Sequence, residues 1–382
     1  MQIFSYIFLF IFSTFILFYS YFIFQDYNSI PYYSTQNQVE FFKFNDNLFS
    51  NGTPTQLGWS RHPIWTYRRD FIHYPSIFIK EWDYYATFIE EKNIWICLTM
   101  SDLGYASLFS LSIIDLNLKK YNQIDEIKLF TLGNLNLPNN SLVNHKIEYK
   151  GKNLNILFSK ENNKRYIKVN SNNFINPNGE KGIKAIFESF QDENMESINI
   201  QTNWQHNKKL FYLNEKVNSL ESTGEISVNN INYILKNKAF TVLDWGRGVW
   251  AYTGTWYWAH SSGIINGDKI GFNFGYGFSD RSPATENCIF FNNKIHKLND
   301  VTFYMPEGDL LKKNWEIKSK DDRVNLIFKP LVNRQSKMNF FIIKSEQQQV
   351  FGIFEGKLIL DNGKVIIINN LNGFAEKVYN RW

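Results

Sequence analysis

The residues best suited to do chemistry lie between Asp244 and Asn287. This stretch begins Asp244-Trp245-Gly246-Arg247-Gly248-Val249-Trp250, continues with Trp256-Tyr257-Trp258 and ends with Thr285-Glu286-Asn287. Tryptophan is large and usually buried, and glycine lets a backbone or a ligand approach closely. A charged residue among such neighbours is either paired or has a perturbed pKa. The combination predicts the wall of a pocket, but it does not name a reaction.

Other polar residues are weaker candidates. Asp280, Glu286 and Asn287 follow a glycine-rich segment, and they either line the same pocket or cap a turn. Asp102 and Tyr105 come from the other half of the chain. They either share a proton or fix a ligand hydroxyl, unless they only form the bend at a strand end. His62 precedes a proline, which favours an extended or turn conformation and a structural role.

Known cofactor motifs are missing from the sequence. There is no Ser/His/Asp triad, no Walker loop and no dinucleotide fingerprint, because Gly246-x-Gly248 lacks the helix that a nucleotide site needs after it. No Cys/His spacing suggests a zinc site. The sequence therefore predicts no cofactor and no metal.

Composition and charge narrow the class further. Aromatic residues make up 18% of the chain, which favours β structure. The net charge of +5 is spread over 382 residues, and this predicts no nucleic-acid partner. Cys97 and Cys288 both lie in apolar, strand-like runs, so we expect buried free thiols, with a disulfide between them as the alternative.

The amino terminus carries no charged side chain from Met1 to Gln25. An apolar run of about 20 residues can span a bilayer as a helix. A cleaved signal peptide would show a basic start, a shorter apolar core and a small-residue cleavage site, none of which is clear here. We expect an uncleaved single-span anchor, with a cleaved signal as the alternative. The nearest basic residue, Lys43, lies too far away to orient the span, and the amino group alone weakly favours an extracytoplasmic domain.

Short apolar runs separated by Asn, Gly and Lys turns fill the rest of the chain. Glu90–Asn93 predicts one hairpin turn, and Asp361-Asn362-Gly363-Lys364 predicts another between Val350–Leu360 and Val365–Ile368. Many short strands with regular turns are typical of barrels and sandwiches. The polar stretch Lys208–Thr223 interrupts the strand rhythm and suggests a boundary. We therefore expect an anchor over residues 1–25, a linker over 26–50, and two β domains over 51–215 and 216–382.

Several motifs occur in a specific order along the chain. They are Gly58-Trp59-Ser60-Arg61-His62-Pro63, Lys80–Tyr85, Thr99–Ala106, Asp244–Trp250, Trp256–Gly263, Asn273–Asn287, Arg323–Phe328, Gln349–Gly352 and Leu371–Glu376. This order resembles the bacterial family called domain of unknown function 2804, over roughly residues 50 to 382. The apolar segment Met1–Phe24 is an addition to the family pattern.

A looser resemblance concerns the acidic-aromatic-glycine turn at Asp244 and the Trp-x-Trp that follows it. These are similar to the central motif of the carotenoid hydratase and tocopherol cyclase-like group, although Trp245 stands where that group has a histidine. The resemblance implies two lipocalin-like antiparallel barrels or sandwiches packed together. Barrels of about eight strands can hold one small ligand.

The same resemblance makes Asp244 the catalytic candidate. In hydratase-type chemistry a carboxylic acid in an apolar pocket protonates a carbon–carbon double bond, and aromatic faces stabilise the resulting cation. The alternative is an Asp244–Arg247 ion pair that holds a turn. The expected ligand-binding residues are Trp245, Arg247, Trp250, Trp256, Trp258, Asp280, Glu286, Asn287, Asp102 and Tyr105.

Three functions remain open at this point. The first is a membrane-anchored, lipocalin-like protein that binds a hydrophobic small molecule, such as a lipid or an isoprenoid. The second is a hydratase, cyclase or isomerase that acts on such a molecule without a cofactor and uses Asp244 as general acid. The third is a structural envelope protein without a ligand.

Overall fold

The fold is mostly β, as the composition and turn pattern predict. The computed structural model describes residues 7, 9–17, 20, 37–44, 48–237, 239–340 and 343–382. Within them the strands form two large antiparallel sheets and one small hairpin, β1 (Phe49–Ser50) with β2 (Thr53–Pro54). Three short 3₁₀ helices, η1 (Arg69–Phe71), η2 (Ser76–Phe78) and η3 (Glu90–Lys92), lie in connections.

The first sheet has 13 strands, and its main path runs β7-β6-β5-β4-β15-β13-β11-β10-β9-β8. These strands are β4 (Ile79–Ile89), β5 (Ile94–Asp102), β6 (Ala106–Asp115), β7 (Lys120–Leu129), β8 (His145–Lys150), β9 (Asn155–Glu161), β10 (Lys164–Ile175), β11 (Lys181–Phe190), β13 (Asn207–Val228) and β15 (Ala239–Val249). Off this path, β12 (Ile198–Trp204) pairs with β13 and with β3 (Gly58–Ser60), and β14 (Ile231–Ile234) pairs with β13.

The second sheet has nine strands in the order β19-β18-β17-β16-β24-β23-β22-β21-β20. They are β16 (Thr253–Ile265), β17 (Asp268–Tyr276), β18 (Cys288–Phe291), β19 (Lys294–Lys297), β20 (Val301–Tyr304), β21 (Trp315–Ser319), β22 (Val324–Phe340), β23 (Ile343–Ile359) and β24 (Val365–Arg381). The two predicted hairpins are confirmed: β4 pairs with β5 across Glu90–Asn93, and β23 pairs with β24 across the Asn362-Gly363 turn.

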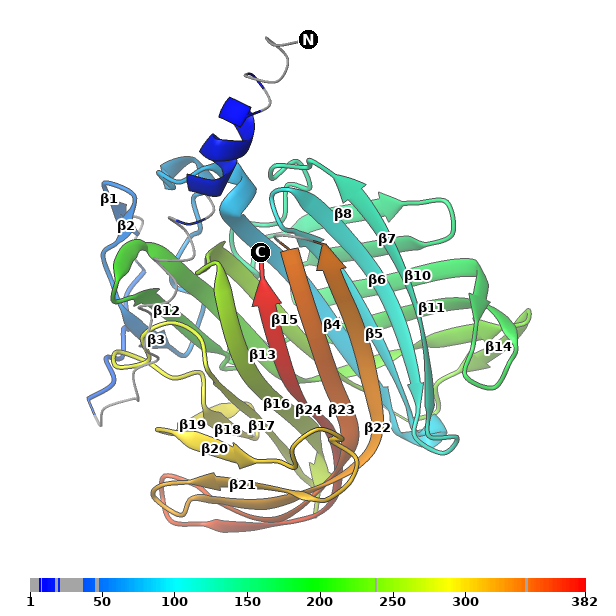
Figure 1. Cartoon of the computed structure of the whole chain (residues 1–382). Helices are drawn as coiled ribbons and strands as arrows, with labels where there is room; N and C mark the ends of the chain where they lie inside the picture. The colour runs from blue at the N-terminus through cyan, green and yellow to red at the C-terminus, as the bar shows by residue number, and fades with distance from the viewer. Residues whose placement is uncertain are drawn as a thin grey trace.

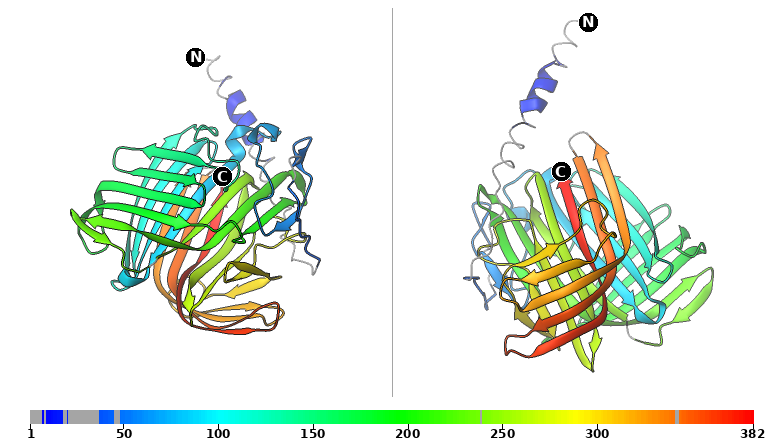
Figure 2. Two further views of the ribbon diagram at one scale, coloured as in Figure 1. Left: turned by 180° about the vertical axis from the view of Figure 1, so that it is seen from behind. Right: turned by 60° about the horizontal axis from the view of Figure 1, so that its bottom comes forward.

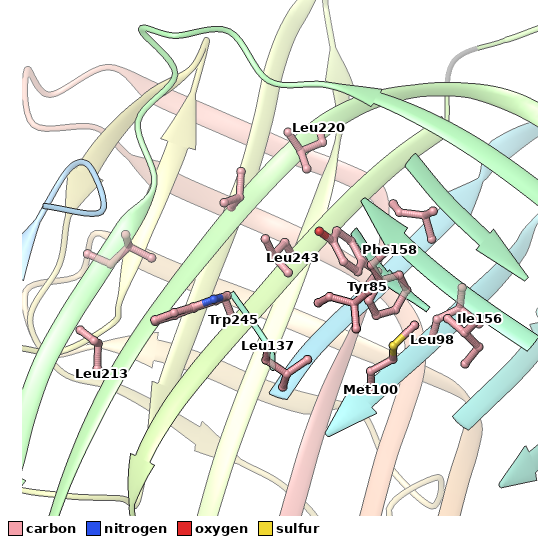
Figure 3. Close-up of a cluster of buried hydrophobic side chains, with 14 of the residues drawn as sticks. Tyr85, Leu98, Met100, Leu137, Ile156, Phe158, Leu213, Leu220, Leu243 and Trp245 are labelled. Atoms are coloured by element: carbon pink, nitrogen blue, oxygen red, sulfur yellow. The ribbon is translucent and has the colours of Figure 1, made fainter. Parts of the chain in front are cut away.

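Each sheet curls around a hydrophobic core of its own (Figures 1 and 2). Tyr85, Leu98 and Trp245 belong to the core of the first sheet (Figure 3), while Phe272, Phe328 and Phe354 belong to that of the second. Among the described residues, the end strands of a sheet are not hydrogen-bonded to each other. Each sheet is therefore a curled half-barrel. The sequence predicted either barrels or sandwiches, and neither sheet closes into a barrel.

A third core joins the two sheets back to back. In Figure 1, strands β16, β24 and β23 lie over β15, β4 and β5. The core between them contains Tyr84, Trp95 and Val242 from the first sheet and Trp258 and Phe374 from the second. Because neighbouring residues of a strand point to opposite faces, Tyr84 enters this shared core, whereas Tyr85 enters the core of the first sheet.

The expected boundary falls inside an element. Lys208–Thr223 does not interrupt the strand rhythm, since all of it belongs to the 22-residue strand β13. Residues 210–220 of this strand are all buried, including the polar residues Asn214, Glu215 and Lys216. A polar stretch can therefore form a strand when both of its faces are covered by packed side chains. The chain changes from one sheet to the other between β15 and β16.

At the amino terminus the structure describes a helix over residues 9–17, and most of the predicted anchor over 1–25 and linker over 26–50 lies outside the described residues. Within the described part of the chain, no helix is both long enough and apolar enough to cross a membrane. The anchor therefore stays a prediction.

Candidate functional site

The candidate site lies between the sheets, on the faces that meet back to back. In the first sheet Lys216, Asp244 and Tyr84 are direct neighbours on β13, β15 and β4. In the second sheet Trp258, Glu376 and Gln349 are direct neighbours on β16, β24 and β23. Residues that are directly opposite in a ladder point to the same face. Each sheet therefore contributes one row of side chains to the interface.

Asp244 is buried and pairs with a lysine. Its Oδ2 accepts from Lys216 Nζ at 2.8 Å, and its Oδ1 accepts from Asn214 Nδ2 at 2.7 Å. The Lys216 ammonium lies 4.0 Å from the centre of the Trp258 ring and only 3% of its side chain is exposed. Buried charges persist when they are paired in this way. Asp244 therefore holds the lysine in place between the sheets.

The predicted alternative, an Asp244–Arg247 pair, is wrong. The two residues are three positions apart on β15, so their side chains point to opposite faces. Arg247 Nη2 instead donates to Asp83 Oδ1 at 2.8 Å inside the first half-barrel. Trp245 lies on that same inner side, where its indole N–H donates to the Pro138 carbonyl and its ring contacts the Arg247 guanidinium. The structure thus separates Trp245 and Arg247 from Asp244.

Glu376 is a buried acid whose neighbours are mostly neutral. Its Oε1 accepts from Trp256 Nε1 at 3.2 Å, and its Oε2 accepts from Gln349 Nε2 at 3.1 Å. Gln349 also contacts the Tyr84 hydroxyl. Burial raises the pKa of Glu376 to about 7, although the positive charges of Arg334 and Lys216 act in the opposite direction. Glu376 can therefore give or take a proton near neutral pH.

Glu286 adds a third carboxyl group to this interface. A Cβ on Gly275 would lie 1.8 Å from Glu286 Oε1, which shows that the carboxyl group rests directly on this glycine, beside Trp258. Burial raises the pKa of Glu286, and the charge of Lys216 opposes that shift. The negative charges of Asp244, Glu286 and Glu376 all add to the effect of burial in raising the pKa of Tyr212, so all three lie within electrostatic reach of this residue. We call Lys216, Asp244, Glu286, Glu376, Gln349 and Tyr84 the intersheet site.

An aromatic cluster adjoins the intersheet site, centred on Trp250. Its indole ring contacts the rings of Trp82, Trp204, Tyr212, Trp256, Phe278 and Trp382 at centroid distances of 4.8 to 6.2 Å. We call these seven residues the tryptophan cluster. Trp250 is buried, and its indole N–H has no hydrogen-bond partner among the described residues. Trp82, Trp256 and Trp382 are half-buried, so the cluster reaches the surface.

The glycines of the motif make room for this cluster. Asp244, Gly246 and Gly248 share one face of β15, and Trp250 follows directly after its last residue, Val249. A Cβ on Gly246 would lie 2.1 Å from the Trp82 ring, which therefore lies flat across the strand at this position and stacks on Tyr212. The structure thus places Trp250 against Trp256, and Trp256 and Trp258 beside Glu376. That these residues bind a ligand stays a prediction.

Asp280 and Asn287 have structural contacts. Asp280 Oδ1 accepts from Ser282 N, and its Oδ2 accepts from the exposed Gln205 side chain, so it caps a turn. Asn287 Oδ1 accepts from Gly275 N, and its amide donates to the Asn299 carbonyl. These bonds use the polar atoms of both residues within loops. Asp280 and Asn287 therefore have structural roles, which was the predicted alternative to lining a pocket.

Asp102 and Tyr105 also lie outside the intersheet site. Asp102 accepts from the backbone N–H groups of Gly104 and Gly133, and so it ties two loops together. The ring of Tyr105 lies 4.4 Å from Lys80 Nζ, which also lies 5.3 Å from the centre of the Trp382 ring. Burial lowers the pKa of Lys80 to about 7. Tyr105 is therefore connected to the edge of the tryptophan cluster only through Lys80.

Lys216, Glu376 and Gln349 are site residues that sequence reasoning missed. Lys216 lies in the stretch interpreted as a boundary, while Gln349 and Glu376 fall in motifs that carry the family resemblance. Neither motif, Gln349–Gly352 or Leu371–Glu376, contains a pattern that singles out the polar residue for chemistry. The two cysteines are buried and free, as predicted.

Several solved structures are similar to this one. A protein assigned as AttH from Nitrosomonas europaea has a TM-score of 0.48 and 9% sequence identity, and the match covers 81% of this chain and 95% of that one. Kievitone hydratase from Nectria haematococca has a TM-score of 0.42 and 12% identity, with 79% and 88% covered, and CghA with Sch210972 has a TM-score of 0.44 and 8% identity, with 80% and 88% covered. Likeness at this level implies nothing about activity. No curated protein matches the chain.

The family resemblance, in contrast, covers nearly the whole chain. The model of the family described as domain of unknown function (DUF2804) matches residues 38–382, which include every strand of both sheets. The chain therefore belongs to the DUF2804 family.

Proposed function

We propose that this protein binds a hydrophobic small molecule, a lipid or an isoprenoid, at the tryptophan cluster. The observation that carries the proposal is the indole N–H of Trp250, which is buried among six aromatic rings and finds no acceptor in the described part of the chain. A buried donor without a partner is rare in native proteins and points to a missing group. A ligand with an apolar body and one oxygen would satisfy both the rings and this donor.

The half-buried rings provide the route for such a ligand. Trp82, Trp256 and Trp382 are all partly exposed, and Trp256 joins the cluster to Glu376 through its own indole N–H. A ligand that enters between these rings meets aromatic faces first and the carboxyl group of Glu376 next. Sites of this kind, apolar with a few convergent polar groups, are typical for small molecules.

The test uses the full-length chain in mild detergent. Farnesol, as the probe, is titrated while tryptophan fluorescence is recorded, and native mass spectrometry searches for a co-purified lipid. Trp256→Leu is expected to weaken farnesol binding by about tenfold, because it removes one of the aromatic rings that would contact the ligand. Trp245→Phe is the matched control, because Trp245 points to the face of β15 opposite to Asp244, where its indole contacts the Pro138 carbonyl and Arg247. Equal farnesol affinity in both variants, or no saturable binding to the native protein, would contradict the proposal.

A second candidate function is acid–base catalysis on the bound molecule, in the manner of a hydratase, cyclase or isomerase. Glu376 favours it, because its pKa of about 7 suits a general acid at neutral pH and Trp256 and Trp258 lie beside it to stabilise a cation. Asp244, the acid expected from the sequence, has both oxygens engaged by Lys216 and Asn214. Glu376→Gln is expected to keep farnesol binding and to abolish turnover of any lipid that the native protein converts.

The proposal includes attachment to a membrane through residues 1–25, with the two half-barrels on the extracytoplasmic side. Its support is the apolar, uncharged sequence of this segment. Protease added to intact spheroplasts should degrade the half-barrels if they lie outside. Protection that lasts until the cells are lysed would place them inside instead.

A further inference from the structure

A cavity that shares no residue with the intersheet site is lined mostly by polar side chains. Its volume is about 360 Å³, and it lies at the ends of strands β8 to β11, against the segment around His62. Its lining residues are His62, Pro63, Leu142, Asn144, Lys160, Asn162, Asn163, Gln191, Asp192, Glu193 and Met195. The volume falls at the lower end of the range for small-molecule sites. It has room for a metabolite of modest size.

The buried part of this lining contains a lysine without a counter-ion. Lys160 is only 5% exposed, and its ammonium donates to the carbonyl oxygen of Asn162. Among the described residues, no carboxylate lies within ion-pair distance of it. Burial lowers the pKa of Lys160, and the nearby charge of Arg165 lowers it further. A buried ammonium that has only a neutral partner favours an anion in the adjoining space.

A second buried cation lies directly behind the cavity wall. Arg165 is fully buried, and within the described part of the chain its guanidinium bonds only to neutral groups: the Gln191 side chain, the Ser141 carbonyl and the Tyr85 hydroxyl. Glu215 lies within electrostatic reach of Arg165 and Lys160, and burial raises the pKa of Glu215. Among the described residues, however, Arg165 has no direct ion-pair partner.

Arg165 also fixes the orientation of Gln191. Gln191 Oε1 accepts from Arg165 Nε at 2.9 Å and from Arg165 Nη2 at 2.6 Å. With its oxygen held on the guanidinium, Gln191 has its NH₂ group left for the cavity that it lines. Asn144, an exposed residue at the edge of the cavity, is oriented in the same way, because its Oδ1 accepts from Asn162 N at 2.9 Å and its NH₂ group is left as a donor. Lys160, Gln191 and Asn144 thus offer hydrogen-bond donors to one space.

The acidic lining residues lie at the outer edge of the cavity. Asp192 and Glu193 are both exposed, and Asp192 Oδ1 accepts from the backbone N–H of Asn194. Water screens exposed charges much more effectively than buried ones. The deep end of the cavity is therefore electropositive, whereas its entrance is mixed.

We propose that this cavity is a second binding site, which takes a small anionic molecule, a carboxylate or a phosphate ester, with the anion on Lys160 and on the amide groups of Gln191 and Asn144. The anion would supply the counter-charge that Lys160 and Arg165 lack. This site is independent of the tryptophan cluster and of the proposed function there. Charge-assisted hydrogen bonds to a buried ammonium provide most of the affinity.

Isothermal titration calorimetry on the full-length chain tests the proposal. Inorganic phosphate, acetate and glucose are titrated separately at pH 7, with ionic strength held constant by sodium chloride. Saturable binding of phosphate or acetate is expected, and the tighter of the two identifies the class of anion. Binding of neither anion, or tighter binding of glucose than of both, would overturn the proposal.

Two variants and one control locate the binding. Lys160→Met is expected to lower the anion affinity by about tenfold or more, because it removes the charge and keeps most of the volume. Gln191→Glu places a carboxylate against Arg165, and it should abolish anion binding while the melting temperature is kept or raised. Lys168→Met, on an exposed lysine of β10, should leave the affinity unchanged. Wild-type affinity in both Lys160→Met and Gln191→Glu would also overturn the proposal.

Discussion

Lys216 organises the charges of the intersheet site. It is one buried ammonium with three carboxyl groups around it, and only Asp244 forms a direct ion pair with it. A buried region tolerates little net charge, so the other two acids shift toward their neutral forms. Burial raises the pKa of both Glu286 and Glu376, with Glu376 at about 7. The residue that exchanges a proton near neutrality is therefore Glu376, on a strand far along the chain from Asp244.

The raised pKa of Glu376 makes stability depend on pH. Its native pKa of about 7 exceeds the ordinary glutamate value of 4.5, so the native state binds the proton more tightly than the unfolded state. The contribution is fully present below pH of about 4.5 and is lost as pH rises to about 7, by about 3 kcal/mol in total. Urea unfolding at pH 5 and pH 8 measures this loss. The Glu376→Gln variant should lose about 3 kcal/mol less over the same interval, and parallel curves for the two proteins would contradict the raised pKa.

Removal of the Asp244 charge should alter both stability and Glu376. In Asp244→Asn, Lys216 loses its counter-ion inside the protein, which costs about 3–5 kcal/mol when nothing replaces it. Glu376 can replace it in part, because the negative charge of Asp244 now raises the pKa of Glu376 and Lys216 lowers it. We expect a loss of stability at the low end of that range and a lower pKa of Glu376. Infrared titration of the protonated carboxyl band measures the pKa, with Glu376→Gln to assign the band. An unchanged carboxyl titration would show that the two acids are not coupled.

At the scale of elements, strand β15 is the central part of the site. One face contributes Asp244 to the contact between the sheets, and the other contributes Trp245 and Arg247 to the first half-barrel. On the face of Asp244, Gly246 leaves space for the Trp82 ring of β4, and Gly248 lies against the Phe211 backbone of β13. Alternation along this one strand therefore decides which residues of the motif meet.

The glycine in this strand can be tested directly. A Cβ on Gly246 would lie 2.1 Å from the Trp82 ring, which is confined between Tyr212 and Trp250. Gly246→Ala should therefore displace Trp82 and cost about 1–3 kcal/mol through overpacking. Thermal unfolding and near-ultraviolet circular dichroism report the two effects. Gly254→Ala is the control, since nothing lies within 4 Å of a Cβ there. Equal melting temperatures for the two variants would mean that Trp82 does not lie over Gly246.

Local patterns predicted local structure well. The hairpin turns at Glu90–Asn93 and Asp361–Lys364 and the shared face of Trp256 and Trp258 follow from turn chemistry and from the two-residue period of strands. The partners of Asp244 and Arg247 could not be predicted, because they depend on which strands become neighbours. Lys216 reaches Asp244 from 28 residues away, and Glu376 comes from the other sheet. A polar run such as Lys208–Thr223 fits either a linker or a strand whose polar side chains are buried by partners from other strands, and only the fold decides.

At the scale of the whole molecule, the two half-barrels form one unit because they share a core. Trp95 from the first sheet packs against Phe351 and Phe374 from the second, and Arg334 donates from β22 to the Ser112 hydroxyl on β6. The intersheet site lies in this shared contact. Neither half-barrel contains a complete site of its own, because Lys216 and Asp244 belong to one sheet and Glu376 and Gln349 to the other.

The segment just before the first strand belongs to this unit, whereas residues 1–25 are predicted to serve only as an anchor. Gln38 Oε1 accepts from Thr285 N at 2.7 Å, and Glu40 pairs with Arg61 at 2.8 Å. Deletion of residues 1–25 should therefore keep the melting temperature and release the protein into the soluble fraction. Deletion of residues 1–44 is the comparison, because it also removes Gln38 and Glu40 and should lower the melting temperature. Membranes washed at high pH separate anchored from loosely bound protein. If the shorter deletion still pellets after this wash, the half-barrels themselves hold the membrane and residues 1–25 are not its anchor.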